Sequence, residues 1–165
     1  MPARAQRHWL MKSEPDCFSI DHLAAAKDQT ASWDGVRNYQ ARNFMRDEMK
    51  LGDLVLFYHS SVQPPGVAGI AKVVRESHPD HTSWDPAGEH FDPKSTPAAP
   101  RWFMVAVQLV RKLPRLVTLE ELRAIPDLAG MPLLNRSRLS VQPVTPEQYA
   151  LIVALAEPSR RSRSA

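Results

Sequence analysis

Residues 32–49, SWDGVRNYQARNFMRDEM, bring aromatic, amide and guanidinium side chains together in one short stretch. Trp33 stands in a polar turn, and a helical pattern that carries Arg42 follows it. An indole beside hydrogen-bonding groups can form a stacking wall for a flat, polar ligand. The alternative is a tryptophan at the rim of the core, with a solvated helix behind it. The residues alone leave both interpretations open, although we expect Asn38 and Asn43 to satisfy local backbone groups.

A second group of reactive side chains gathers in an irregular, proline-rich segment, residues 78–100. Its histidines and aspartates are His78, Asp80, His81, Asp85, His90 and Asp92. Such groups can bind a divalent metal, but their spacing matches no helical H-x-x-x-H pair. We therefore expect solvated loop polarity, with no metal and no cofactor.

The segment DLVLFYHSS, residues 53–61, places polar groups at the end of an apolar strand. Strand alternation directs Tyr58 and Ser60 to one face and His59 to the other. At a strand end these side chains can converge on a ligand. The alternative is that Tyr58 belongs to the core and His59 makes a routine hydrogen bond.

Several common chemistries have no motif to support them. The chain contains no G-x-x-x-x-G-K-[ST], no G-x-G-x-x-G and no G-x-S-x-G sequence. Cys17 is the single cysteine, so no intramolecular disulfide can form, which fits a reducing compartment. We expect Cys17 to be a small buried hydrophobe rather than a nucleophile.

The basic character of the chain belongs to its ends. Of 21 lysines and arginines, five fall in residues 1–7 and 158–165, which contain none of the 18 acids. Residues 8–157 therefore carry 16 − 18 = −2 charges, so any nucleic-acid binding must rest on a local site. We expect a flexible N-terminal tail, one domain over residues 8–157 and a disordered arginine-rich C-terminal tail.

The hydropathy pattern contains neither a membrane-spanning run nor a secretory signal. Frequent arginine, alanine and proline are typical of a GC-rich bacterial genome. We therefore expect a cytoplasmic protein, or a nuclear one in a eukaryote.

Periodicity and capping signals predict an α+β fold. Strands are expected over residues 8–15, 53–61, 67–77, 101–113 and 137–144. Helices are expected over residues 19–29, along the stripe Ala41, Phe44, Met45 and Met49, and over residues 118–125 and 145–157. Three of the strands are joined without crossover helices, which favours a small, curved, mostly antiparallel sheet.

Seven motifs in this order resemble those of the EVE domain family. They are WLMKSEP, WDGVRNYQARNFMR, KLGDLVLFYHS, GIAKVV, FDPK, RWFMVAVQLV and RLSVQPVT, and they extend over residues 8–156. The resemblance implies a PUA-like fold, a small, mostly antiparallel β-barrel surrounded by helices. EVE domains are similar to YTH domains, which hold methylated adenine in an aromatic cage, and are proposed readers of modified bases such as methylated cytosine.

The resemblance also implies a ligand site. Its matched positions are Lys12 and Ser13 at a strand end, Trp33 as the first cage aromatic, Tyr58, His59 and Ser60 near the mouth, and Arg138, Ser140 and Gln142 beside the ligand backbone. Phe91, in the FDPK motif, is preferred over Trp84 as the second cage aromatic. In this hypothesis Trp33 faces the ligand, and Lys12 or Arg138 meets a phosphate.

The resulting expectation is a non-enzymatic module that binds a modified nucleobase in DNA or RNA. Two alternatives come from other classes. One is an enzyme that acts on nucleotides or modified nucleic acid with the groups of residues 78–100. The other is a protein-interaction module with a vestigial pocket.

Overall fold

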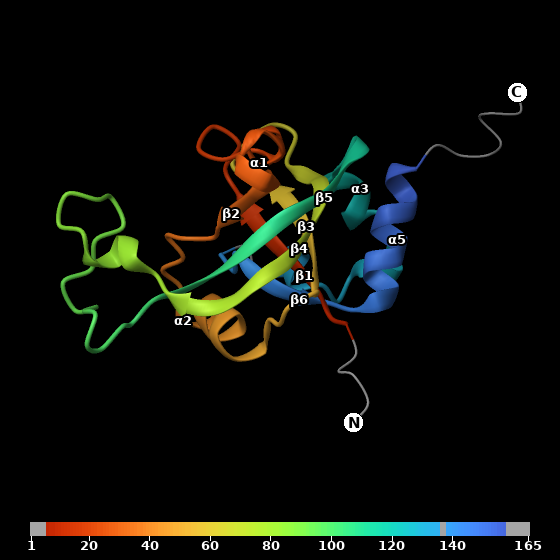
Figure 1. Ribbon diagram of the computed structural model, residues 1–165. Coiled ribbons are helices and arrows are strands. Elements are labelled where there is room, and N and C mark those ends of the chain that lie inside the picture. Colours follow the sequence, from red (N-terminus) through yellow and green to blue (C-terminus); the bar gives the residue numbers. More distant parts are fainter. Residues whose placement is uncertain (1–5, 136–137, 158–165) are drawn as a thin grey trace, which may run out of the picture.

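The computed structural model describes residues 6–135 and 138–157, which build one six-stranded sheet with helices on both faces (Figure 1). The strands are β1 (His8–Ser13), β2 (Thr30–Ser32), β3 (Leu54–His59), β4 (Gly66–Pro79), β5 (Phe103–Thr118) and β6 (Val141–Val144). Their order is β2-β5-β4-β3-β1-β6, with β2 and β6 at the edges. The α+β class and the mostly antiparallel sheet are confirmed, but the ladder is open rather than closed into a barrel.

One strand pair departs from the antiparallel pattern. β1 pairs with β3 in parallel, from His8 opposite Leu54 to Ser13 opposite His59. The C-terminal ends of the two strands therefore lie side by side. These strand ends form part of the candidate site.

The helices are short and well capped. They are α1 (Ile20–Ala25), α2 (Tyr39–Asn43), α3 (Leu119–Arg123), α4 (Pro132–Asn135) and α5 (Pro146–Ala156), with short turns η1 (Lys27–Gln29), η2 (Phe44–Glu48), η3 (His81–Trp84) and η4 (Pro126–Leu128). Ser19, Thr118 and Thr145 cap α1, α3 and α5. The capping boxes at Thr118 and Thr145 agree with the Glu or Gln three residues farther on, whereas the box at Ser19 uses His22. None of the helices within the described ranges has the length and apolar run needed to span a bilayer.

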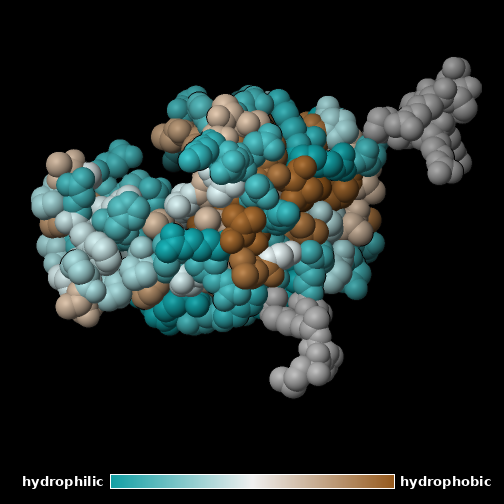
Figure 2. Space-filling model, in the orientation of Figure 1, coloured by the Kyte–Doolittle hydropathy of each residue, from teal (hydrophilic) through white to brown (hydrophobic). Residues whose placement is uncertain are grey.

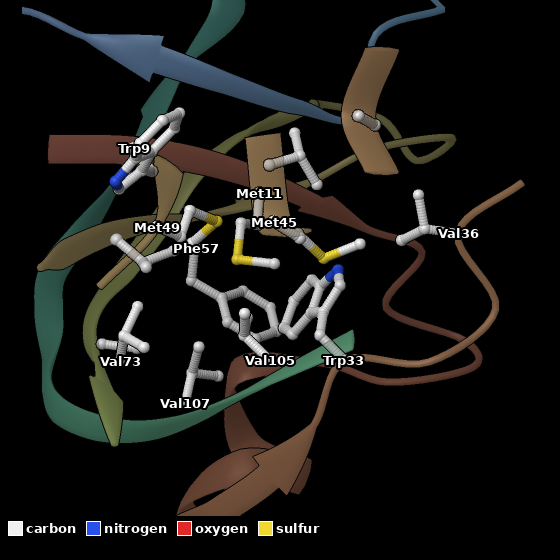
Figure 3. Close-up of a cluster of buried hydrophobic side chains, with 14 of the residues drawn as sticks. Trp9, Met11, Trp33, Val36, Met45, Met49, Phe57, Val73, Val105 and Val107 are labelled. Carbon is white, nitrogen blue, oxygen red and sulfur yellow. The ribbon is translucent and has the colours of Figure 1, made fainter. Parts of the chain in front are cut away.

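Alternation along the central strands gives the sheet two cores. Trp9, Met11 and Phe57 face the first core, where α1, α2 and η2 add Ile20, Leu23, Ala41, Met45 and Met49 (Figure 3). Leu10, Leu56 and Tyr58 face the second core, beneath α3, η4, α4 and α5. The predicted stripe is confirmed, with Ala41, Met45 and Met49 buried and Phe44 partly buried against them. The turn η2 is π-helical, and the Met49 N–H donates to Phe44 O at 2.9 Å.

The long connection between β4 and β5 forms a lobe, residues 80–102, that projects from the body at the left of Figures 1 and 2. Its surface is largely hydrophilic. β4 is longer than its predicted strand at both ends, whereas β5 begins two residues later than predicted and continues to Thr118. The two strands support the lobe where Pro79 pairs with Phe103.

The described part of the N-terminal segment begins at Gln6, and the described part of the C-terminal segment ends at Glu157. Residues 1–5 and 158–165, which belong to the two predicted tails, lie outside the described residues. Gln6 Nε2 donates to Gly52 O at 2.7 Å, and Arg7 forms an ion pair with Glu48 at 2.9 Å.

Candidate functional site

A cleft of about 1240 Å³ opens between the lobe and the shared end of β1 and β3. It is lined by residues from segments 12–18, 31–37, 58–65, 81–90, 119–133 and 138–140. Its formal charges are mixed, with the cations Lys12, Arg37, Arg123 and Arg138 and the carboxylates Glu14, Asp34, Asp85 and Glu89. The cleft can therefore accept a polar ligand that carries both positive and negative partial charges.

Backbone hydrogen bonds bring three of the predicted site segments together. Ser60 N donates to Ser13 O at 2.9 Å, so the ends of β1 and β3 stay joined beyond the strands. Lys12 N donates to Ser140 O at 2.9 Å, which attaches the segment before β6. Lys12, Ser13, Ser60 and Ser140 accordingly line one cleft, as does Arg138.

Trp33 lines the cleft but belongs mainly to the first core. Its indole is 8% exposed and meets the ring of Phe57 edge-on, with centroids 5.3 Å apart. The sequence left both a core-rim position and a ligand wall open for Trp33, and the structure places it at the rim of the core and in the cleft lining. The backbone N–H of Trp33 donates to Val105 O at 2.8 Å and continues the pairing of β2 with β5. That pairing directs the side chain into the first core (Figure 3), and Trp33 also lines the cleft.

Tyr58 and His59 separate, as strand alternation predicts. Tyr58 is 3% exposed, packs in the second core and lines the cleft. Burial raises the pKa of its hydroxyl, so the phenol stays protonated and can donate a hydrogen bond at neutral pH. His59 instead accepts a hydrogen bond from Ile20 N on Nε2 at 3.1 Å and lies outside the cleft lining. Burial lowers the pKa of His59, which suits an imidazole that must remain an acceptor.

Two of the four cationic groups of the cleft, Lys12 and Arg138, belong to its strand-end side. Lys12 is half-buried at the end of β1, and burial lowers the pKa of its amine. Arg138 is exposed beside it in the lining, together with the half-buried Ser140. Gln142, which the resemblance places near the ligand, is fully buried in β6 and donates to Leu139 O at 3.0 Å.

Neither proposed second cage aromatic lines the cleft. Phe91 is 40% exposed, and Trp84 has a buried indole nitrogen without a partner among the described residues. The cleft contains Phe18 instead, whose ring lies perpendicular to Trp33 at 6.5 Å. The sequence analysis missed Phe18, which follows the KSEP motif in the turn after β1. The signal that could have found it is an aromatic residue in a polar turn.

Cys17 lies in the same turn. The expectation of a buried cysteine is wrong, since Cys17 is exposed and lines the cleft. The chain leaves the sheet at this turn, before the core-facing positions of α1 begin at Ile20.

Two carboxylates of residues 78–92, Asp80 and Asp92, hold the lobe in place. Asp80 is fully buried and accepts from Gly35 N at 2.8 Å and Arg37 Nη1 at 3.0 Å. Arg37 also donates to His90 O at 2.6 Å, so one network joins the 33–37 turn to the lobe. Asp92 accepts from Trp102 Nε1 at 2.7 Å. Among residues 6–135 and 138–157, no three His, Cys, Asp or Glu side chains are arranged to hold a metal ion.

The same network sets the shape of the cleft wall. Gly35 has φ +77°, and a Cβ there would lie 2.7 Å from the His90 ring. Both residues line the cleft. The turn and the lobe are therefore in direct contact, and glycine is required where they meet.

Comparisons with known proteins agree with this architecture. The EVE domain family model matches residues 7–155. Thymocyte nuclear protein 1 of Mus musculus is 47% identical over 167 residues, which cover 91% of this chain and 74% of that protein.

Two solved structures extend the comparison. The human THYN1 protein in complex with DNA containing 5-methylcytosine has a TM-score of 0.89 and 44% identity, over 93% of this chain and 99% of that one. The YTH domain of Zygosaccharomyces rouxii MRB1, in complex with N6-methyladenosine RNA, has a TM-score of 0.54 and 14% identity, over 94% of this chain and 87% of that one. The second likeness concerns the fold alone.

Proposed function

The chain belongs to the EVE domain family, and on that premise we propose that its cleft receives a methylated nucleobase of DNA without carrying out chemistry on it. The observation that carries the proposal is the cleft itself. It joins the rings of Phe18, Trp33 and Tyr58 to the cations Lys12 and Arg138 in one space. The human relative bound to 5-methylcytosine DNA makes 5-methylcytosine the first base to test.

The size and chemistry of the cleft suit a base taken out of a duplex. Extrusion of a base costs a few kcal/mol, and stacking on an aromatic group returns about 1–3 kcal/mol. The protonated hydroxyl of Tyr58 can donate to a base acceptor, and the cleft carboxylates can accept from an exocyclic amine. Lys12 and Arg138 then lie at the side where the chain of the nucleic acid would leave the cleft.

A methyl group adds a modest preference. Burying one carbon contributes about 0.8 kcal/mol, which corresponds to about fourfold in affinity. We expect 5-methyl-2′-deoxycytidine to bind about fourfold more tightly than 2′-deoxycytidine, provided that the methyl group contacts the rings of Phe18 or Trp33.

Nuclear magnetic resonance titration of the ¹⁵N-labelled protein with the two free nucleosides tests this proposal. We expect shifts in the amides of Ser13, Gly35 and Ser60 and in the indole N–H of Trp33, at lower concentration for the methylated nucleoside. If the two nucleosides bind with equal affinity, the cleft has no preference for the methyl group. Shifts confined to surfaces outside the cleft would show that the cleft is not the base site.

A further inference from the structure

A cluster of arginines and aromatic rings lies beside the cleft, at the base of the lobe. It consists of Tyr39, Arg42, Arg46, Arg101 and Trp102, and we refer to it as the ridge. The ring of Tyr39 stacks on that of Trp102, with centroids 4.9 Å apart and planes 23° apart. The ridge uses none of the groups that form the base site, so it needs an explanation of its own.

Arg42 is the fixed centre of the ridge. Its guanidinium carbon lies 4.8 Å from the Tyr39 ring centroid and 5.9 Å from that of Trp102. Arg42 Nη1 donates to Arg101 O at 2.9 Å, and Nε and Nη2 donate to Asn43 Oδ1. These acceptors are neutral oxygens, so among the described residues the positive charge of Arg42 is held in place without a hydrogen-bonded carboxylate. The three bonds engage three of five N–H donors and leave two for a further acceptor.

Two more arginines add to the positive charge around Arg42. Arg46 lies with its guanidinium carbon 6.0 Å from the Phe103 ring centroid and pairs with Asp47, which is exposed. Arg101 lies 3.9 Å from a carboxylate oxygen of Asp92, which already accepts from Trp102. Burial lowers the pKa of Arg42, and the charges of Arg46 and Arg101 lower it further, whereas Tyr39 and Asp47 act in the opposite direction.

Tyr39 gives the ridge an exposed aromatic surface. Its side chain is 51% exposed, whereas Trp102 beneath it is 5% exposed. The surrounding surface over α2 is hydrophilic (Figure 2), so the ring is not part of an apolar docking face. An exposed ring among arginines is typical of surfaces that bind the sugars, bases and phosphates of nucleic acids.

The ridge is continuous with the cleft through Arg37. Arg37 lines the cleft, and its guanidinium carbon lies 5.3 Å from the Trp102 ring centroid. A nucleic acid that places one base in the cleft therefore has its flanking backbone within reach of the ridge.

We propose that the ridge binds the sugar–phosphate backbone next to the nucleotide whose base enters the cleft, independently of sequence and of methylation. This inference rests on the proposed function, because it assigns a second contact to the same ligand. Arg42 and Arg101 supply donors to phosphate oxygens, and Tyr39 packs against the sugar or an adjacent base.

The test measures binding of a 14-base-pair duplex, with and without one central 5-methylcytosine, at several salt concentrations. Arg42→Gln and Arg101→Gln are each expected to weaken binding of both duplexes about tenfold at low salt. Each is also expected to reduce the slope of log affinity against log salt by about one. Arg101→Gln serves as the second variant because the Arg101 side chain is 32% exposed and the backbone oxygen that accepts from Arg42 is kept.

Arg111→Gln is the matched control, since it removes one charge on β5 ten residues farther along the chain from Arg101. It should leave the salt slope close to that of the wild type. If the ridge variants bind both duplexes like this control, the ridge proposal is overturned. Binding of free 5-methyl-2′-deoxycytidine is measured in parallel, because the ridge variants should retain it and its absence in the wild type would overturn the base site instead.

Discussion

Replacing Trp33 with alanine should lower the free energy of unfolding by about 3–5 kcal/mol, because it leaves a cavity in the first core. The indole is 8% exposed and packs edge-on against Phe57 and Phe18. Thermal and urea unfolding followed by circular dichroism would measure the loss. A destabilisation below about 1 kcal/mol would show that Trp33 adds little to the core.

Trp33→Phe separates stability from recognition. Phenylalanine keeps an aromatic ring in the core but is smaller than the indole that lines the cleft. We expect a smaller loss of stability than with alanine, together with weaker binding of 5-methyl-2′-deoxycytidine. Loss of binding in Trp33→Ala alone carries little weight, since a destabilised core changes the cleft as well.

Replacing Asp80 with alanine should cost about 3–5 kcal/mol, the range for removing one partner of a buried ion pair. The Asp80 side chain is fully buried, and its loss leaves Gly35 N–H without its acceptor. The Arg37 guanidinium loses its carboxylate partner, although Arg37 keeps its bond to His90 O. Because this network joins the 33–37 turn to the lobe, base binding should fall too. Urea unfolding at neutral pH measures the first effect, and the nucleoside titration measures the second.

Asp80→Asn is the matched variant, because it keeps the size of the side chain and removes the charge. Burial raises the pKa of Asp80, but hydrogen bonds from Thr82, Gly35 and Arg37 outweigh it and hold the pKa below its usual value. The unfolded state therefore binds more protons than the folded state in acid. The ionised Asp80 carboxylate therefore adds to the free energy of unfolding, and the wild type should lose this stabilisation as pH falls below about 3.8. Asp80→Asn should show no loss of stability from this group over the same pH range. An asparagine variant as stable as the wild type would contradict the role of the ion pair.

Local signals in the sequence predicted most of the framework. The capping boxes at Thr118 and Thr145 depend on residues three apart, and the stripe of Met45 and Met49 depends on one helical turn. Such features need no knowledge of distant contacts. β2 was missed because three residues, Thr30–Ser32, are too few to show alternation.

The parts of the site that the sequence did not predict depend on contacts between distant segments. The parallel pairing of β1 with β3 joins residues more than forty positions apart, and it alone makes Ser13 and His59 neighbours. Trp33 looked like a turn residue until its backbone bond to Val105 fixed its direction. Asp80 looked like loop polarity, yet it is buried because Gly35 and Arg37 satisfy its charge.

The central claim is that the cleft, and not the charged surface, distinguishes a methylated base. The most direct measurement compares the affinity for duplexes with and without one 5-methylcytosine in the wild type, in Ser140→Trp and in Thr96→Trp. Ser140 lines the cleft, so a tryptophan there should fill it, whereas the exposed Thr96 lies outside the lining. We expect the wild type and Thr96→Trp to prefer the methylated duplex about fourfold, and Ser140→Trp to bind both duplexes equally. A preference that survives in Ser140→Trp would contradict the account, as would a folded wild type that binds the two duplexes alike.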